Sequence, residues 1–155
     1  MTLQNIETVD RPHVVPKPWG HEEIFALVPG KFCGKVLHVR AGHSLSLQYH
    51  RQKEEVISVY SGTARVHVGP SLDELREVEL QPGDGLHLPP GVIHRIAAVT
   101  DLVMLEASTT ELDDVVRLVD DYGRAGAAVA GAAAASVPNP ASTRSPEPTG
   151  GAGSH

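Results

Sequence analysis

The chain is punctuated by turn signals such as Pro29-Gly30 and Gly69-Pro70, which divide its middle into nine short segments rich in strand-forming residues. The segments are Glu22–Val28, Lys35–Arg40, Leu45–His50, Val56–Tyr60, Ala64–Val68, Arg76–Leu80, Gly85–Leu88, His94–Val99 and Leu102–Ala107. Short strands that recur about every 8–12 residues, without a sustained 3.6-residue period, are typical of a β-sandwich or barrel. The best helix candidate is Leu112–Val119. The sequence therefore predicts an all-β protein.

The two ends of the chain differ in composition from this central part. Pro12, Pro16 and Pro18 predict an extended N-terminal arm over residues 1–21. In residues 125–155, Ala, Gly, Pro and Ser make up 23 of 31 positions, so we expect a disordered tail. Residues 22–124 remain to fold as one domain.

Composition excludes several classes of protein. The net charge of −6 and the lack of a basic cluster argue against nucleic-acid binding. Cys33 is the only cysteine, which excludes an intrachain disulfide and a cysteine-based zinc site. No apolar run approaches the ~20 residues of a membrane helix, and the first residues lack the pattern of a signal peptide. We therefore expect a cytoplasmic protein that binds neither nucleic acid nor membrane.

The segment Leu45–His50 carries the first sign of chemistry. Side chains alternate across a strand, so Ser46, Gln48 and His50 share one face. An amide oxygen and an imidazole thus point the same way, and Glu55 follows at the start of the next apolar segment.

Two spaced blocks contain these residues: Gly42-x5-Gln48-x-His50-x4-Glu55-x6-Gly62 and Gly83-x5-Pro89-Pro90-Gly91-x2-His94. Together they resemble the paired motifs of the cupins, with Gln48 where many cupins carry a histidine. The resemblance implies a jelly-roll barrel (a double-stranded β-helix) and four metal ligands: Gln48, His50, Glu55 and His94. Two imidazoles, a carboxylate and an amide oxygen suit a divalent zinc, iron, manganese, cobalt or nickel ion. If the ion is five- or six-coordinate, four protein ligands leave one or two positions for water or substrate.

Further blocks narrow the resemblance: Lys17-Pro18-Trp19-Gly20, Ser61-Gly62-Thr63-Ala64, Leu88 to Arg95, Asp113 to Arg117 and Asp121 to Arg124. In this order they are similar to the C-terminal cupin domain of type II mannose-6-phosphate isomerases. The resemblance implies a metal-dependent aldose–ketose isomerase that interconverts mannose 6-phosphate and fructose 6-phosphate. Val56-Ile57 replace a His-Trp pair of that family, which keeps two alternatives open. These are another metal cupin enzyme (epimerase-, lyase- or oxygenase-like) and a non-catalytic carbohydrate-binding cupin.

The resemblance also suggests roles for charged residues near the motifs. Lys53 stands where the family has an arginine and Arg95 follows His94, so both are expected to stabilise negative charge in the transition state. The expected substrate-binding residues are Lys17, Trp19, Lys35, Arg51, His87, Arg117 and Arg124. Glu54 and His87 are both candidates for the general base. Open sheet edges and the resemblance favour a homodimer.

The predicted tail supplies a first test. Truncation after Arg124, or a few residues beyond, is expected to leave fold and activity intact, because residues 125–155 lack the apolar surface that would offset their ordering entropy. Circular dichroism and metal analysis of the shortened chain check this. A truncated protein that fails to fold or loses its metal would contradict it.

Overall fold

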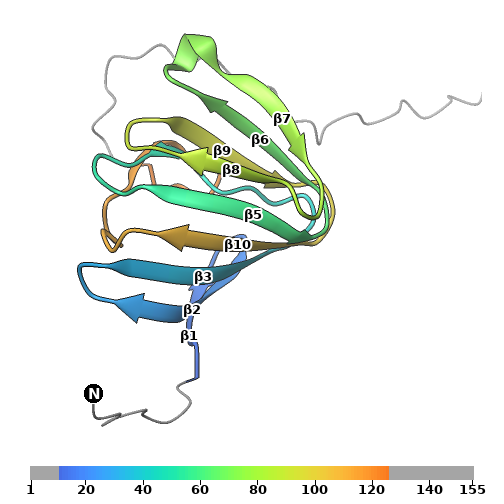
Figure 1. The fold of residues 1–155 in the computed structure, drawn as a ribbon. Coiled ribbons are helices and arrows are strands. Elements are labelled where there is room, and N and C mark those ends of the chain that lie inside the picture. Colours follow the sequence, from blue (N-terminus) through green and yellow to red (C-terminus); the bar gives the residue numbers. More distant parts are fainter. Residues whose placement is uncertain (1–10, 126–155) are drawn as a thin grey trace, which may run out of the picture.

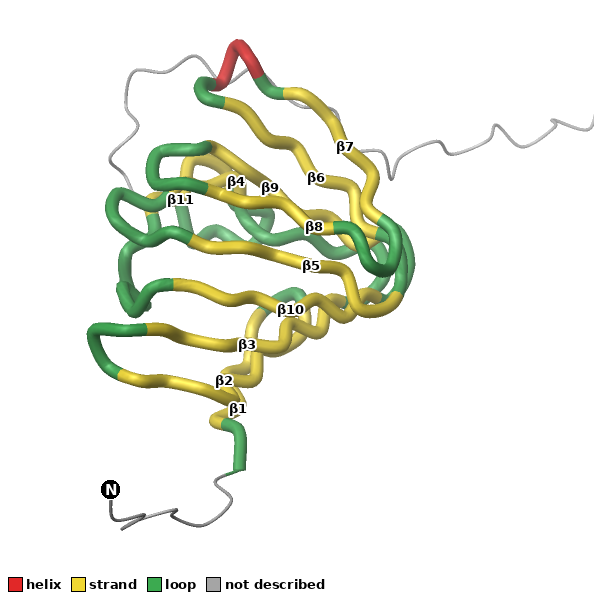
Figure 2. The backbone as a smooth tube through the Cα atoms, in the orientation of Figure 1, coloured by secondary structure: helices red, strands yellow, loops and turns green. Residues whose placement is uncertain are grey.

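The computed structural model describes residues 11–125, and these residues form the all-β architecture that the sequence predicts (Figure 1). The strands are β1 (His13–Lys17), β2 (Gly20–Val28), β3 (Phe32–Val39), β4 (Leu47–Tyr49), β5 (Glu55–Ser61), β6 (Ala64–Gly69), β7 (Arg76–Leu80), β8 (Gly85–Leu88), β9 (Ile93–Ala98), β10 (Leu102–Ser108) and β11 (Val116–Val119). The only helical element among the described residues is a short 3-10 turn at Leu72–Glu74, coloured red in Figure 2.

The strands form two antiparallel sheets. One sheet has six strands in the order β1-β2-β3-β10-β5-β8, and the other has five in the order β11-β4-β9-β6-β7. Strands from distant parts of the chain are therefore neighbours, since β10 lies between β3 and β5. The buried apolar side chains of both sheets form one core, which includes Leu37, Val66 and Met104. Figure 1 shows the two sheets curving over one another, as in a jelly-roll barrel.

The helix expected over Leu112–Val119 is wrong. Val116–Val119 form β11, which runs antiparallel to β4 with Arg117 opposite Gln48. Two physical causes favour the strand. The segment is rich in valine, whose branched side chain is restricted in a helix. The edge of β4 also offers unpaired backbone groups that β11 satisfies.

The N-terminal segment is tied to the barrel by backbone pairing. Within the segment expected as an extended arm, His13–Lys17 form β1 and pair with β2. This pairing directs Trp19 into the core, where it is only 3% exposed. Residues 1–10 and 126–155, which include nearly all of the expected tail, lie outside the described residues. No helix in the part of the chain that the structure describes has the length and apolar character needed to cross a membrane.

The turn between β5 and β6 depends on Gly62. Its φ is +87°, and a Cβ at this position would lie 2.1 Å from the backbone oxygen of Asp101. Gly62→Ala is therefore expected to lower the free energy of unfolding by about 2–4 kcal/mol, from backbone strain and steric conflict together. Urea unfolding of the variant measures this loss.

Gly42→Ala is the matched control, because Gly42 has a φ of +77° but a Cβ there would meet nothing within 4 Å. Its loss is expected to be about 1–2 kcal/mol, from the left-handed backbone alone. Equal losses in the two variants would contradict a role for the close approach to Asp101.

Candidate metal centre

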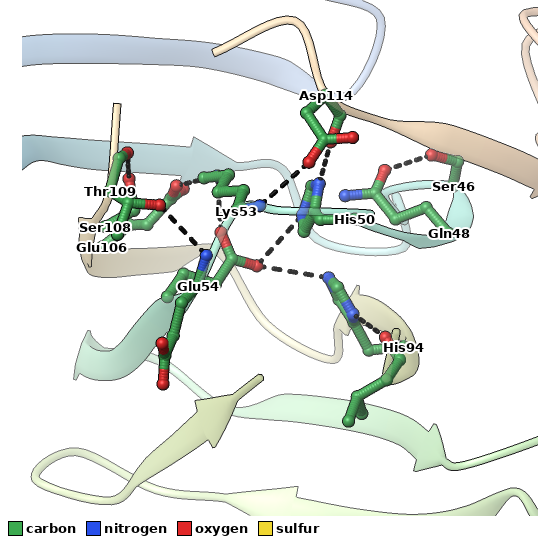
Figure 3. A network of polar contacts seen from close by, with 12 residues as sticks. Ser46, Gln48, His50, Lys53, Glu54, His94, Glu106, Ser108, Thr109 and Asp114 are labelled. Atoms are coloured by element: carbon green, nitrogen blue, oxygen red, sulfur yellow. Dashed lines mark hydrogen bonds and ion pairs between the residues drawn. The ribbon is translucent and has the colours of Figure 1, made fainter. Parts of the chain in front are cut away.

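Three buried side chains converge inside one end of the barrel. His50 directly follows β4, Glu55 begins β5 and His94 lies in β9. Their candidate ligand atoms all lie within 4.8 Å of one another, and the three residues are 6%, 4% and 2% exposed. Both imidazoles face the Glu55 carboxylate, and dashed lines in Figure 3 mark these contacts of His50 and His94. The two sequence motifs thus meet at one point, from both sheets.

Hydrogen bonds to the backbone fix the orientation of both imidazoles. His50 Nδ1 donates to the backbone oxygen of Asp114, and His94 Nδ1 donates to the backbone oxygen of Val92 at 3.0 Å. The opposite nitrogens, Nε2 of His50 and of His94, lie 3.4 and 3.3 Å from Glu55 Oε1. His50 Nε2 is also buried without a hydrogen-bond partner in the described structure.

This arrangement fits a cation. With Nδ1 as the proton-bearing nitrogen, each Nε2 turns its lone pair towards a carboxylate oxygen, and such a contact is repulsive unless a positive charge lies between them. Two imidazole nitrogens and a carboxylate oxygen are ligands that suit a divalent transition metal ion. The residues present therefore match the metal site of a cupin.

Gln48 lies beside this triad but holds a different partner. It faces His94 across β4 and β9 and lines the same cavity. The Ser46 hydroxyl donates to Gln48 Oε1 at 2.5 Å (Figure 3). Because a hydroxyl both donates and accepts, the amide can rotate its oxygen into the cavity and keep Ser46 as a partner through its nitrogen. Gln48 thus stays a predicted fourth ligand.

Lys53 is buried between two carboxylates. Its Nζ donates to Glu55 Oε2 at 2.6 Å and to Glu106 Oε1. Burial alone would lower the pKa of Lys53, but the negative charges of Glu106 and Glu55 outweigh it and raise the pKa above its ordinary value. Lys53 therefore remains a cation that orients Glu55, with the other carboxylate oxygen left to face the imidazoles.

The two carboxylates around Lys53 have opposite pKa shifts. Burial would raise the pKa of Glu55, but its contacts with His50 and His94 and the charge of Lys53 hold that pKa well below its ordinary value. Burial raises the pKa of Glu106, and the neighbouring negative charge of Glu55 raises it further. Of the two carboxylates, the one that faces the imidazoles therefore has the lower pKa.

Sequence reasoning missed Glu106, although a signal existed. Alternation along β10 places Glu106 on the same face as Leu102 and Met104, which are buried. A lone carboxylate on a core-facing row requires a buried partner. Its partner Lys53 is 53 residues away in sequence and could not be identified from that pattern.

Asp114 was also missed, and it fixes the turn between β4 and β5. Its carboxylate accepts backbone hydrogen bonds from Arg51, Gln52 and Lys53 at 3.1, 2.6 and 2.9 Å. These hydrogen bonds, that from Lys53 foremost, hold the pKa of Asp114 below its usual value. The segment before β11 therefore positions both His50 and the turn that carries Lys53. No residue pattern around Asp114 signals this role.

The cavity wall brings together most of the predicted site residues. Besides the triad, Gln48 and Lys53, the predicted residues that line it are Lys17, Trp19, Lys35, Arg117 and Arg124. Glu22, which was not predicted, holds Lys35 and Lys17 at 3.4 and 3.7 Å.

Arg117 differs from the other cations in the wall. Arg124 forms an ion pair with Asp120. Arg117 has no ion pair among residues 11–125, and its Nε is buried without a hydrogen-bond partner there. Arg117 is therefore available to an anion in the cavity.

Four residues given roles from the sequence lie away from the cavity. His87 and Glu54 are exposed and contact each other, with His87 Nε2 2.6 Å from Glu54 Oε1. Arg95 forms an ion pair with Asp121, because alternation along β9 sends it to the face opposite His94. Arg51 is exposed on the turn after β4. The structure does not bring these side chains to the triad.

Comparison with known proteins agrees with this geometry. The Cupin domain family matches residues 35–108. The chain is 33% identical over 115 residues to "Xanthan biosynthesis protein XanB" of Xanthomonas campestris pv. campestris, a match that covers 71% of this chain and 23% of that protein. It is 33% identical over 116 residues to "Mannose-1-phosphate guanylyltransferase" of Escherichia coli K12, with the same coverage. The "Alginate biosynthesis protein AlgA" of Pseudomonas syringae pv. tomato is 31% identical over 122 residues, 76% of this chain and 24% of that protein. The chain thus spans about a quarter of the length of these relatives.

Solved structures show the same fold at low sequence identity. CapF matches with a TM-score of 0.63 and 20% identity, covering 70% of this chain and 35% of CapF. Oxalate decarboxylase of Lactobacillus farciminis matches with a TM-score of 0.59 and 21% identity, covering 69% of this chain and 33% of that one. KdgF of Halomonas sp. matches with a TM-score of 0.54 and 18% identity, covering 65% of this chain and 90% of that one. The chain therefore belongs to the cupins, and its domain matches the C-terminal cupin region of the bifunctional ManC, AlgA and XanB proteins.

Proposed function

We propose that this protein is a metal-dependent aldose–ketose isomerase that interconverts mannose 6-phosphate and fructose 6-phosphate. The observation that carries the proposal is one cavity that contains both the His50/Glu55/His94 triad and an unpaired cation, Arg117. A phosphosugar has complementary parts, because its hydroxyl and carbonyl oxygens suit a metal and its phosphate requires a cation. The match to the cupin region of ManC and AlgA supports the same substrate class.

We further propose that His50, Glu55, His94 and Gln48 hold one divalent ion of zinc, iron, manganese, cobalt or nickel. Such an ion, when bound, polarises the sugar carbonyl and stabilises the negative charge that develops on its oxygen. The protein's part is to hold the ligands in place. Lys53 and the backbone oxygens of Asp114 and Val92 do this by hydrogen bonding.

The phosphate is assigned to the cationic part of the wall. A dianion in a cavity with little water needs charge-assisted hydrogen bonds. Arg117 supplies an unpaired guanidinium from β11, opposite Gln48 on β4. Lys17 and Lys35 add positive charge, although Glu22 partly neutralises both. Arg117 is therefore the principal phosphate ligand in this proposal.

Proton transfer between C2 and C1 requires a base in the cavity. The earlier candidates, Glu54 and His87, are exposed outside it. Glu22 and Glu106 line the cavity and are not among the proposed metal ligands. The proposal therefore assigns proton transfer to one of these two carboxylates.

Removal of one ligand tests the metal. His50→Ala is expected to retain less than about a tenth of the metal that the wild type holds at the buried triad after dialysis, because one of few ligands is lost. The melting temperature should fall as well, since binding at 1,000 times Kd stabilises a folded protein by about 4 kcal/mol. Elemental analysis and thermal unfolding of protein without a histidine tag measure both. His87→Ala, an exposed histidine beside a carboxylate, is the control. Equal metal content in the three proteins would contradict the site.

A coupled assay for fructose 6-phosphate production tests the reaction and Arg117 together. Arg117→Ala is expected to raise KM for mannose 6-phosphate by about 10- to 100-fold, with a smaller change in kcat, because a charge-assisted hydrogen bond contributes about 1.5–3 kcal/mol. Arg76→Ala, on the exposed strand β7, is the control and should leave both constants unchanged.

The same assay separates the alternatives. If metal-loaded wild type isomerises no hexose phosphate, the isomerase proposal is wrong. Oxygen uptake would then favour an oxygenase-like cupin, and tight sugar binding without turnover would favour a carbohydrate-binding protein.

A further inference from the structure

A second cluster of metal-binding side chains lies on the outer face of the six-stranded sheet. It consists of His21 and Glu23 from β2 and His38 from β3. Alternation along β2 sends Glu22 to the cavity and its two neighbours to the opposite face. His21 and His38 are directly opposite each other in the register of β2 and β3. The backbone pairing therefore fixes the positions from which all three side chains project.

The three side chains converge on one carboxylate oxygen. The Nε2 atoms of His21 and His38 each lie 3.4 Å from Glu23 Oε1. The two rings are stacked, with centroids 4.3 Å apart and planes 14° from parallel. The side chains are 39%, 36% and 31% exposed for His21, His38 and Glu23. The cluster thus repeats the arrangement of the buried triad at a half-exposed surface.

These distances match shared coordination better than hydrogen bonding. The contact of His21 Nε2 with Glu23 Oε1 is a long hydrogen bond at best, because 3.4 Å exceeds the 2.7–3.2 Å of a normal N–H···O hydrogen bond, and the contact of His38 Nε2 has the same length. Two atoms bound to one tetrahedral zinc at about 2.0–2.2 Å lie roughly 3.4 Å apart. The geometry therefore fits a single cation between the two imidazole nitrogens and the carboxylate.

We propose that His21, Glu23 and His38 form a second metal site, separate from the buried triad, for a divalent ion that prefers imidazole ligands, such as zinc. Three protein ligands at a half-exposed surface leave the remaining position to water. This site does not depend on the proposed isomerase activity.

The second site binds more weakly than the buried one. Both imidazoles of the buried triad donate Nδ1–H to a backbone oxygen. Within residues 11–125, neither His21 nor His38 has a hydrogen bond at Nδ1. Such outer partners contribute about 10- to 100-fold in metal affinity. Zinc should therefore fill the buried triad first and the outer site second.

A metal ion bound at the outer site would also stabilise the part of the sheet that forms the cavity wall. The ion would join β2 to β3, whose inner faces carry Glu22 and Lys35. Binding to the folded state alone raises stability as the free metal concentration rises above Kd. The outer site is therefore a stabilising link at the part of the sheet that holds Lys35 and Glu22 together.

Zinc titration of the metal-free full chain, without a histidine tag and against a chromophoric competing chelator, tests the proposal. Wild type is expected to bind two equivalents. His38→Ala and Glu23→Gln should each lose the weaker equivalent and retain the tighter one. His50→Ala should lose the tighter equivalent, and the double variant His38→Ala/His50→Ala should lose both.

His67→Ala is the matched control. His67 is also a strand histidine beside a carboxylate, with Nε2 3.2 Å from Glu77 Oε2. Among residues 11–125, however, it belongs to no group of three metal-binding side chains. This variant should still bind two equivalents. The proposal is overturned if His38→Ala and Glu23→Gln both keep the weaker equivalent, or if wild type lacks it. If wild type binds a single equivalent and His38→Ala removes it, the result contradicts the buried metal site and supports the outer site.

Discussion

Both oxygens of the Glu55 carboxylate have close neighbours, and the arrangement of the site depends on these contacts. Its Oε2 accepts a hydrogen bond from Lys53 at 2.6 Å, while its Oε1 faces the Nε2 atoms of His50 and His94. An ionised carboxylate costs several kcal/mol to bury unless partners compensate its charge. Because His94 comes from β9 and Lys53 from the turn between β4 and β5, the surroundings of this carboxylate are complete only when both sheets are in place. The site thus forms together with the fold rather than after it.

A row of alternating charges extends from Glu55 across the inner face of the six-stranded sheet. Lys53 lies between Glu55 and Glu106, Glu106 is opposite Lys35 in the register of β10 and β3, and Lys35 contacts Glu22 from β2. Each charge has an opposite neighbour, so a polar wall can be buried against an otherwise apolar core. This wall gathers the buried charges on one part of the barrel interior, while apolar residues such as Val66 and Met104 fill the core.

Period-two alternation explains both what could be predicted from sequence and what could not. It places His50 and Gln48 on one face, as the cavity shows, and it identifies most strands because their side chains face a core on one side only. The same rule sends Arg95 away from the triad, although it is adjacent to His94 in sequence. Contacts across distant segments could not be predicted: Lys53 and Glu106 are 53 residues apart, and β11 pairs with β4, which lies far from it in sequence.

The two histidine–glutamate clusters have similar ligand atoms but different surroundings. Both place two Nε2 atoms within 3.4 Å of one carboxylate oxygen, yet their surroundings differ. Around the buried cluster, backbone oxygens orient the imidazoles, Lys53 holds the second carboxylate oxygen, and Arg117 lines the same cavity. The outer cluster lies on an open sheet face. A metal at either place would have similar protein ligands, but only the buried one would act on a molecule held by other residues. The two clusters therefore differ in the charged wall and in the turn held by Asp114, and not in their ligand sets.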